Sequence, residues 1–185
     1  AKLQELVSAV DETGKAGRRV DFADPQPDTI DIIDIANGLS KQCRFSGQCR
    51  AHYSVAQHCV LVSALVPPQA AMAALLHDAA EAYMHDIPSP LKQMLPEYQV
   101  IERRLLGAIH AHFGVRPTEA DQAAIAHADL VMLAKEFREL MPHDDEPWKI
   151  LDVIEPRIKR VFPWDHNRGF QEFLERFNFL RTGRR

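Results

Sequence analysis

The feature that most constrains this sequence is its helical periodicity: apolar residues recur roughly every three to four positions in segments that proline, glycine and capping residues separate. No alternating strand pattern continues for more than a few residues, and we find no internal repeat or low-complexity tract. Residues 13–28 are predicted to form a loop with a short extended piece at 19–22. The predicted helices cover residues 30–42, 54–66, 69–83, 97–113 and 118–141, with a weaker helical segment at 148–160 and an amphipathic one at 169–180. We therefore expect an all-α fold, a single compact helical bundle with short loops.

Capping residues mark several of the predicted ends. Ser54 and Gln57 have the spacing of a capping box at the start of the second helix. Gly114 is expected to end the helix at 97–113, and Thr118 is the expected N-cap of the next one. These local signals are independent of how the helices pack.

The chain of 185 residues is long enough to bury a hydrophobic core as one domain. We expect a single domain over residues 1–185, with the motif-bearing core at about 30–142 and a C-terminal helical extension at 143–185. The acidic stretch at 143–147 is predicted to be a solvated loop, and no segment has the composition of an interdomain linker.

The charge balance excludes some classes of partner. A formal net charge of −4 and an isoelectric point near 6.1 argue against nonspecific binding to nucleic acid or to a membrane surface. No apolar run approaches the ~20 residues that a membrane span needs. The first residues contain no hydrophobic signal core, so we expect a cytoplasmic protein.

The cysteine content predicts reduced thiols. Cys43, Cys49 and Cys59 are an odd number in a chain too large to need disulfides for stability. Cys43 and Cys49 with His52 offer donors of the kind that bind zinc, but a C-x5-C-x2-H spacing is not a usual zinc motif. We therefore favour ordinary cysteines over a zinc site in this segment.

The stretch LLHDAAEAYMHDIPSP at 75–90 places ionisable side chains in a helix whose preceding turns are apolar on every side. Such a helix is expected to be buried, and burying an unpaired carboxylate is very costly unless it is paired or binds a metal. On an α-helix His77 and Asp78 lie about 100° apart, and Glu81 follows one turn beyond both on the same side. The alternative is a solvent-facing turn at the end of the helix.

Two further ionisable residues occupy apolar helix faces. His58 shares a stripe with Val55, Cys59 and Val62, so it is predicted to point inward. Asp129 lies on the face of residues 125, 132, 133, 136 and 140, and we expect it to be buried there. Each could be an isolated core residue, but together with the His-Asp pair they indicate one shared site.

The ordered set His58, His77-Asp78 and Asp129 resembles the H…HD…D pattern of the HD-domain superfamily of metal-dependent phosphohydrolases. The surrounding segments resemble the bacterial 5′-nucleotidase-like branch, which includes deoxynucleoside monophosphatases and small deoxynucleoside triphosphohydrolases. These segments are RF-x-GQ at 44–48, YSVAQH at 53–58, HDAAEAYMHDIPSPLK at 77–92 and HADL around position 129. The similarity extends from about residue 31 to residue 140.

This resemblance implies that the two histidines and two aspartates bind one divalent metal ion. A mixed nitrogen and oxygen donor set suits Mn²⁺, Co²⁺, Fe²⁺, Zn²⁺ or Ni²⁺, with Mg²⁺ as a further candidate, and differs from the thiolate cages of structural zinc. By resemblance, Glu81 is the catalytic residue that transfers a proton or positions water, and Asp86 is a second catalytic acid near the leaving group. Alternatively, Glu81 supports His77 or a bound water, and Asp86 caps the loop that follows it.

The same resemblance assigns substrate contacts to Arg44, Phe45 and Lys92. Arginine offers a planar fork for phosphate, an adjacent aromatic ring can stack on a base, and lysine offers a point charge. Phe45 stands where relatives often have tryptophan, which leaves the base preference open. Lys92 could equally be a solvated lysine at the start of a helix.

The expected function is that of a metal-dependent phosphohydrolase acting on a small-molecule nucleotide, most simply a (deoxy)nucleoside 5′-monophosphate. The alternatives are a deoxynucleoside triphosphate triphosphohydrolase and, from another class, a catalytically inactive metal-binding sensor or interaction module. A purely structural helical bundle is disfavoured by the four inward ionisable residues. We expect no stable nucleic-acid or membrane partner, and we leave a homodimer open.

Overall fold

The computed structural model describes residues 5–7, 19–142 and 160–183 of the chain. Within them the predicted all-α class is confirmed. Three 3-10 turns, η1 (Pro27–Thr29), η2 (Phe45–Gly47) and η3 (Pro68–Ala70), accompany the α-helices. The α-helices are α1 (Ile32–Lys41), α2 (Val55–Leu65), α3 (Ala71–Leu75), α4 (Glu81–Met84), α5 (Ser89–Gln93), α6 (Pro96–Phe113), α7 (Glu119–Leu140) and α8 (His166–Thr182).

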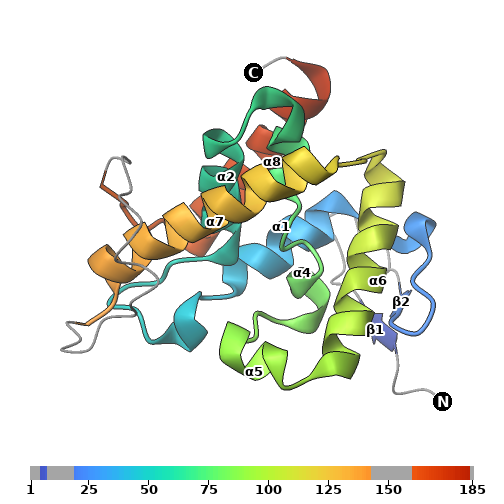
Figure 1. Cartoon of the computed structure of the whole chain (residues 1–185), viewed down its shortest axis with the longest axis horizontal. Helices are drawn as coiled ribbons and strands as arrows, with labels where there is room; N and C mark the ends of the chain where they lie inside the picture. Colours follow the sequence, from blue (N-terminus) through green and yellow to red (C-terminus); the bar gives the residue numbers. More distant parts are fainter. Residues whose placement is uncertain (1–4, 8–18, 143–159, 184–185) are drawn as a thin grey trace.

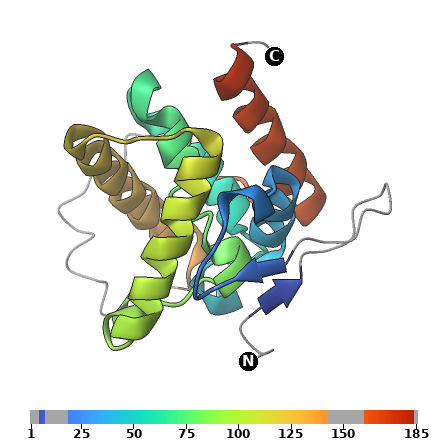
Figure 2. The same cartoon turned by 90° about the vertical axis from the view of Figure 1, so that its right-hand side faces the viewer.

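The extended piece predicted at 19–22 is strand β2 (Arg19–Asp21), which pairs antiparallel with β1 (Glu5–Val7), a strand that the sequence pattern had not indicated. This two-stranded sheet lies at the periphery of the helices (Figure 2). The predicted loop at 143–147 and nearly all of the helix predicted at 148–160 lie outside the described residues. No helix among the described residues is long and apolar enough to cross a membrane.

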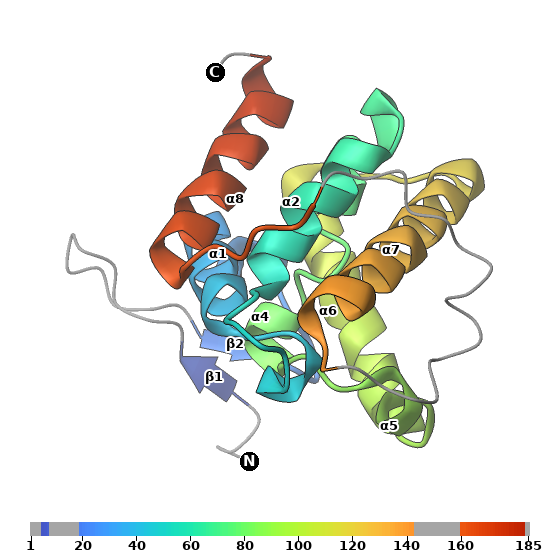
Figure 3. The ribbon, with the colours of Figure 1, turned by 90° about the vertical axis from the view of Figure 1, so that its left-hand side faces the viewer.

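Helix α2 is the centre of the bundle. It packs against α1, α3, α7 and α8, and Figure 3 shows α8, α2 and α7 following one another across one side of the molecule. Figure 1 shows α7 crossing in front of α2, with α6 and α5 on the other side of α1 and α4. Residues placed on α2 can therefore meet residues from most other parts of the fold.

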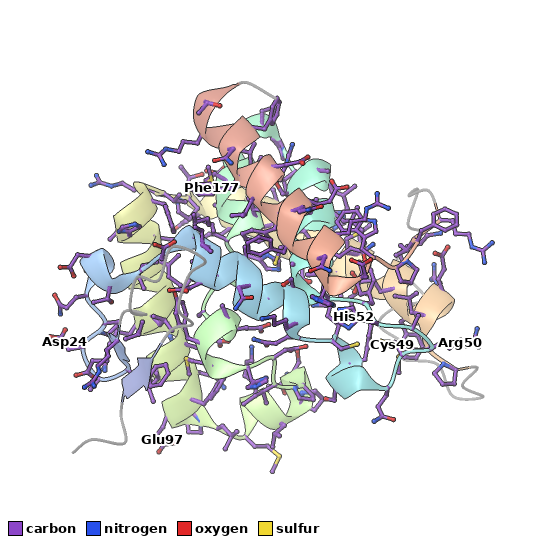
Figure 4. All side chains as sticks on the ribbon, turned by 180° about the vertical axis from the view of Figure 1, so that it is seen from behind. Asp24, Cys49, Arg50, His52, Glu97 and Phe177 are labelled. Atoms are coloured by element: carbon purple, nitrogen blue, oxygen red, sulfur yellow. The ribbon has the colours of Figure 1, made fainter. Side chains whose placement is uncertain are left out.

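Buried apolar side chains of the described residues form two clusters that flank α2. The first joins α1, α2, α6 and α8, and the second joins α2, α3 and α7. Cys59 faces the first cluster and Val62 the second, so both sides of α2 are held by packing. Larger members of the first cluster are Ile35, Leu39, Leu105, Ile109, Phe173 and Phe177, the last labelled in Figure 4.

The predicted caps are present. The Thr118 hydroxyl accepts the amide of Asp121, whose carboxylate in turn accepts the amide of Thr118, a complete capping box at the start of α7. Gly114 ends α6 with φ 67°, a left-handed conformation that suits glycine. Ser54 caps α2 by accepting the amide of Gln57. The Gln57 side chain does not close this capping box, because it binds the backbone of the segment before α8 through Phe162 O and Trp164 N.

The prediction of one continuous helix over 69–83 is wrong. Helix α3 ends at Leu75, residues 76–80 form turns, and α4 begins at Glu81. In a continuous helix the carbonyl oxygen of Ala74 would accept the amide of Asp78, but here Nδ1 of His77 lies 2.8 Å from it. The amide of Glu81 then binds the carbonyl of Asp78 at 2.9 Å, a tighter i−3 bond. The interruption places both His77 and Asp78 in a turn between two short helices.

Candidate metal centre

Three separate elements bring the four predicted metal ligands together. His58 lies on α2, His77 and Asp78 lie in the turn after α3, and Asp129 lies on α7. His58 Nε2 is 3.0 Å from Asp129 Oδ1 and 3.8 Å from Asp78 Oδ2, and His77 Nε2 is 3.2 Å from Asp78 Oδ2. Donor atoms that each lie roughly 2.1 Å from one ion are separated from one another by roughly 3–4.2 Å. These three spacings are compatible with one shared ion.

Both imidazoles direct Nε2 toward this centre. The Nδ1 atom of His77 lies 2.8 Å from the carbonyl oxygen of Ala74, which can only accept, so Nδ1 carries the proton. In the same way Nδ1 of His58 lies 2.7 Å from Oε1 of Glu136. Both Nε2 atoms are buried; that of His58 lies 3.0 Å from a carboxylate oxygen of Asp129, and that of His77 lies 3.2 Å from one of Asp78. In the neutral form of each ring, with the proton on Nδ1, Nε2 is the nitrogen that can bind a metal ion.

The charges around these atoms are strongly coupled. Burial alone would lower the pKa of His77, but the adjacent Asp78 carboxylate raises it well above its ordinary value. Burial would raise the pKa of Asp78, yet His77, His58 and Arg44 together hold it far below its usual range. Asp78 is therefore an ionised carboxylate, the form that binds a cation.

Two groups of side chains in the described part of the chain have the spacing to hold a metal ion. His58, His77 and Asp129 offer three donor atoms that all lie within 4.8 Å of one another, and so do Cys59, His77 and Asp78. The Cys59 thiol is buried, and burial raises its pKa to about 11. Because thiolates and not thiols bind metals, Cys59 is the weaker donor in its group.

Asp129 differs from its prediction in one respect. It was expected to be buried, but its side chain is 43% exposed. His58, the ligand nearest to it, has no exposure. Asp129 is therefore the most exposed of the four predicted ligands.

Glu81 is buried beside this centre and has one oxygen held by a lysine. Burial, followed by the nearby carboxylates of Asp78 and Asp86, raises the pKa of Glu81 well above its ordinary value. Lys92 Nζ lies 3.2 Å from Glu81 Oε1 and 2.7 Å from Glu102 Oε1. Glu81 Oε2 is buried without a hydrogen-bond partner among the described residues. Lys92, expected as a phosphate contact, here holds two carboxylates.

Gln42 connects Glu81 with the other predicted acid, Asp86. Its amide nitrogen donates to the carbonyl oxygen of Glu81 at 2.7 Å, and its amide oxygen accepts the backbone N–H of Asp86 at 3.0 Å. Asp86 lines a cavity of about 580 Å³ together with Ser46 and Gly47 of the loop after α1. Burial raises the pKa of the Asp86 carboxyl.

Arg44 reaches the centre from the loop before α2. Its NH1 atom lies 3.9 Å from Asp78 Oδ2, and its Nε donates to Glu136 Oε2 at 2.9 Å. Burial would lower the pKa of Arg44, but Glu136 and Asp78 more than compensate, so the guanidinium remains charged. Phe45 is half-buried, and its ring lies 5.7 Å from the Arg44 guanidinium carbon. Arg44, a predicted phosphate contact, thus lies beside Asp78, and Phe45 lies beside Arg44.

The amino-acid sequence was compared with models of known protein families and with the sequences of known proteins. No model of a known protein family matches it. It is 44% identical to the uncharacterized protein YfdR of Escherichia coli K12 over 154 residues, which cover 83% of this chain and 85% of YfdR. The chain belongs to the YfdR family. An uncharacterized protein of Rhodobacter capsulatus is 39% identical over 110 residues, 54% of this chain and 56% of that protein.

In this YfdR-family protein the alternative cysteine site is not assembled. The thiols of Cys43 and Cys49 lie 3.4 Å apart, but Nε2 of His52 contacts the backbone oxygen of Ser40 at 3.2 Å. These three residues do not form a metal-binding group in the described part of the chain. Figure 4 shows Cys49 and His52 beside the end of α1.

Sequence reasoning did not identify Glu136 as the shared partner of His58 and Arg44 in this YfdR-family protein. Glu136 has no exposure, and it accepts hydrogen bonds from Tyr53 OH at 2.7 Å, from His58 and from Arg44. The available signal was a glutamate on the apolar face that also carries Asp129. A buried glutamate needs donors, and this one finds them on segments distant in sequence.

Proposed function

We propose that this protein is a divalent-metal-dependent phosphohydrolase of the HD-domain superfamily that acts on nucleotides, with a (deoxy)nucleoside 5′-monophosphate as its substrate. The observation that carries the proposal is the convergence of His58, His77, Asp78 and Asp129, with both histidine Nε2 atoms buried and within 3.2 Å of a carboxylate oxygen. The charged Arg44 guanidinium beside Asp78 supports an anionic substrate at the same place.

The four converging residues would hold the ion, and its candidates are Mn²⁺, Co²⁺, Fe²⁺, Zn²⁺, Ni²⁺ and Mg²⁺. When bound, such an ion lowers the pKa of a coordinated water and neutralises charge on a phosphoryl group. Because the Asp129 side chain is partly exposed, a substrate phosphate could reach the ion from solvent next to Asp129.

Glu81 and Asp86 divide the proton transfers. Glu81 keeps Oε2 free while Lys92 holds Oε1, so Oε2 can orient a water molecule and accept its proton. The Asp86 carboxyl, whose pKa burial raises, would in its protonated form donate to the leaving oxygen of a nucleoside. The Gln42 side chain connects the backbone of Glu81 with that of Asp86 and so fixes their relative position.

Arg44 and Phe45 bind the nucleotide. With Nε held by Glu136, the terminal nitrogens of Arg44 remain to donate to phosphate oxygens. The half-buried Phe45 ring is available to stack on a base. Lys92 is a support for Glu81 in this scheme, since two carboxylates already bind its ammonium group.

A panel of nucleoside mono- and triphosphates assayed with Mn²⁺, Co²⁺, Mg²⁺ and Zn²⁺ tests the proposal. Release of inorganic phosphate from monophosphates is expected. Release of tripolyphosphate from deoxynucleoside triphosphates would replace the monophosphatase with a triphosphohydrolase. A folded, metal-loaded protein that hydrolyses no nucleotide would contradict enzymatic activity and favour a sensor or interaction module.

A further inference from the structure

Glu136 is a buried charged residue that takes no part in the proposed metal coordination or proton transfers. It lies on α7, two turns beyond Asp129, and its side chain has no exposure. A buried carboxylate is very costly unless several donors surround it. Glu136 has three, from Arg44, Tyr53 and His58, at 2.7–2.9 Å. These three donors offset the free-energy cost of removing the Glu136 carboxylate from water.

The two carboxylate oxygens of Glu136 accept hydrogen bonds from different residues. Oε1 accepts from Nδ1 of His58 and from the Tyr53 hydroxyl, and Oε2 accepts from Nε of Arg44. Because Nδ1 faces this carboxylate, the neutral His58 ring places its proton there, and Nε2, which faces Asp78 and Asp129, is the nitrogen left for an ion. The bond to Nε orients the guanidinium, whose NH1 atom lies 3.9 Å from Asp78 Oδ2.

We propose that Glu136 is a positioning residue that holds His58 for the metal ion and Arg44 for the substrate phosphate through a single carboxylate. This inference rests on the proposed function for the identity of those two ligands. Because α7 carries both Asp129 and Glu136, one helix supplies a metal ligand and orients a second ligand on α2. Metal binding and phosphate binding thus both depend on the Glu136 carboxylate.

The substitution Glu136→Gln keeps the size of the side chain but cannot keep both functions. A glutamine amide has one oxygen and one NH₂ group, so the NH₂ must face a donor on one side or the other. If the NH₂ group faces His58, it favours the His58 tautomer with the proton on Nε2, which weakens metal binding. Facing Arg44, it displaces the guanidinium and weakens phosphate binding. Tyr53→Phe is the matched control, since it removes one donor to the same carboxylate but leaves His58 and Arg44 bound to it.

Titration with Mn²⁺, and with inorganic phosphate at saturating Mn²⁺, measures both sides without turnover. Glu136→Gln is expected to weaken Mn²⁺ by about 10–100-fold or phosphate by at least about 5-fold, while Tyr53→Phe stays within about 3-fold of wild type on both. Wild-type affinity of a folded Glu136→Gln variant for both ligands would overturn the proposal. Neither titration requires nucleotide hydrolysis, so a failure of the proposed activity is recognised separately.

The His58 tautomer in the wild type gives a test that needs no variant. Long-range ¹H–¹⁵N spectra of the protein with Zn²⁺ report which ring nitrogen is protonated. A protonated Nδ1 and a metal-bound Nε2 are expected for His58. A His58 that binds zinc through Nδ1, or carries its proton on Nε2, would overturn the proposal, even if Glu136→Gln did not fold.

Discussion

Lys92 donates to Glu81 across a distance of 3.2 Å, and this ion pair links α5 to the first residue of α4. The ammonium group lowers the pKa of Glu81, which burial and the carboxylates of Asp78 and Asp86 otherwise raise. Lys92 therefore favours the ionised, proton-accepting form of Glu81.

Substitution of Lys92 by methionine is expected to move the acidic limb of the pH–rate profile to higher pH. Removing the cation raises the pKa of Glu81 further, so a higher pH is needed to ionise it. Profiles of kcat against pH for wild type and Lys92→Met check this. Glu102→Gln is the control, because Glu102 binds the same ammonium group without belonging to the centre. An increase in KM with an unshifted profile would instead assign Lys92 to the substrate phosphate.

Gly38 is required for the close contact of α1 with α4. A Cβ atom at this position would lie 2.7 Å from the carbonyl oxygen of Ala82, the residue after Glu81. Gly38→Ala is therefore expected to destabilise the protein by about 1–3 kcal/mol and to lower turnover by displacing α4. Gly107→Ala is the control in α6, where a Cβ meets no atom within 4 Å, and it is expected to stabilise by up to about 1 kcal/mol. Urea denaturation measures both, and equal stability of the two variants would contradict the packing argument.

Phe45 is expected to contribute to binding only when the substrate has a base. Phe45→Ala should lower kcat/KM for a nucleoside monophosphate more than for a base-free phosphate ester, by about 1–3 kcal/mol of stacking. Arg44→Ala should affect both substrates alike, because both carry phosphate. Equal losses on the two substrates for Phe45→Ala would remove its ring from the base site.

Helix ends were predictable because their signals are local. Thr118 with Asp121 and Gly114 occupy their expected cap positions, since capping depends on neighbours a few residues away. The break of the helix predicted at 69–83 was not predictable from periodicity, because it involves the specific bond between His77 and Ala74. The apolar pattern of this segment is compatible with either outcome.

The candidate ligands could be selected from sequence because imidazole and carboxylate groups on apolar helix faces are unusual. The residues that bind these side chains could not be predicted from the sequence. Glu136 meets His58 only after α7 packs against α2, and Lys92 meets Glu102 only after α5 folds back on α6. The exposure of Asp129 likewise depends on the position of α7 at the edge of the bundle, which its own sequence does not encode.

The central claim is that one divalent ion is held jointly by residues of α2, α7 and the turn after α3. Isothermal titration with Mn²⁺ tests it most directly, with Asp129→Ala compared with His127→Ala, which changes an exposed residue two positions away on the same helix. We expect one ion per chain in the wild type and in His127→Ala, and at least about 100-fold weaker binding in Asp129→Ala. Unchanged Mn²⁺ binding by a folded Asp129→Ala variant, or no binding by the wild type, would contradict the claim.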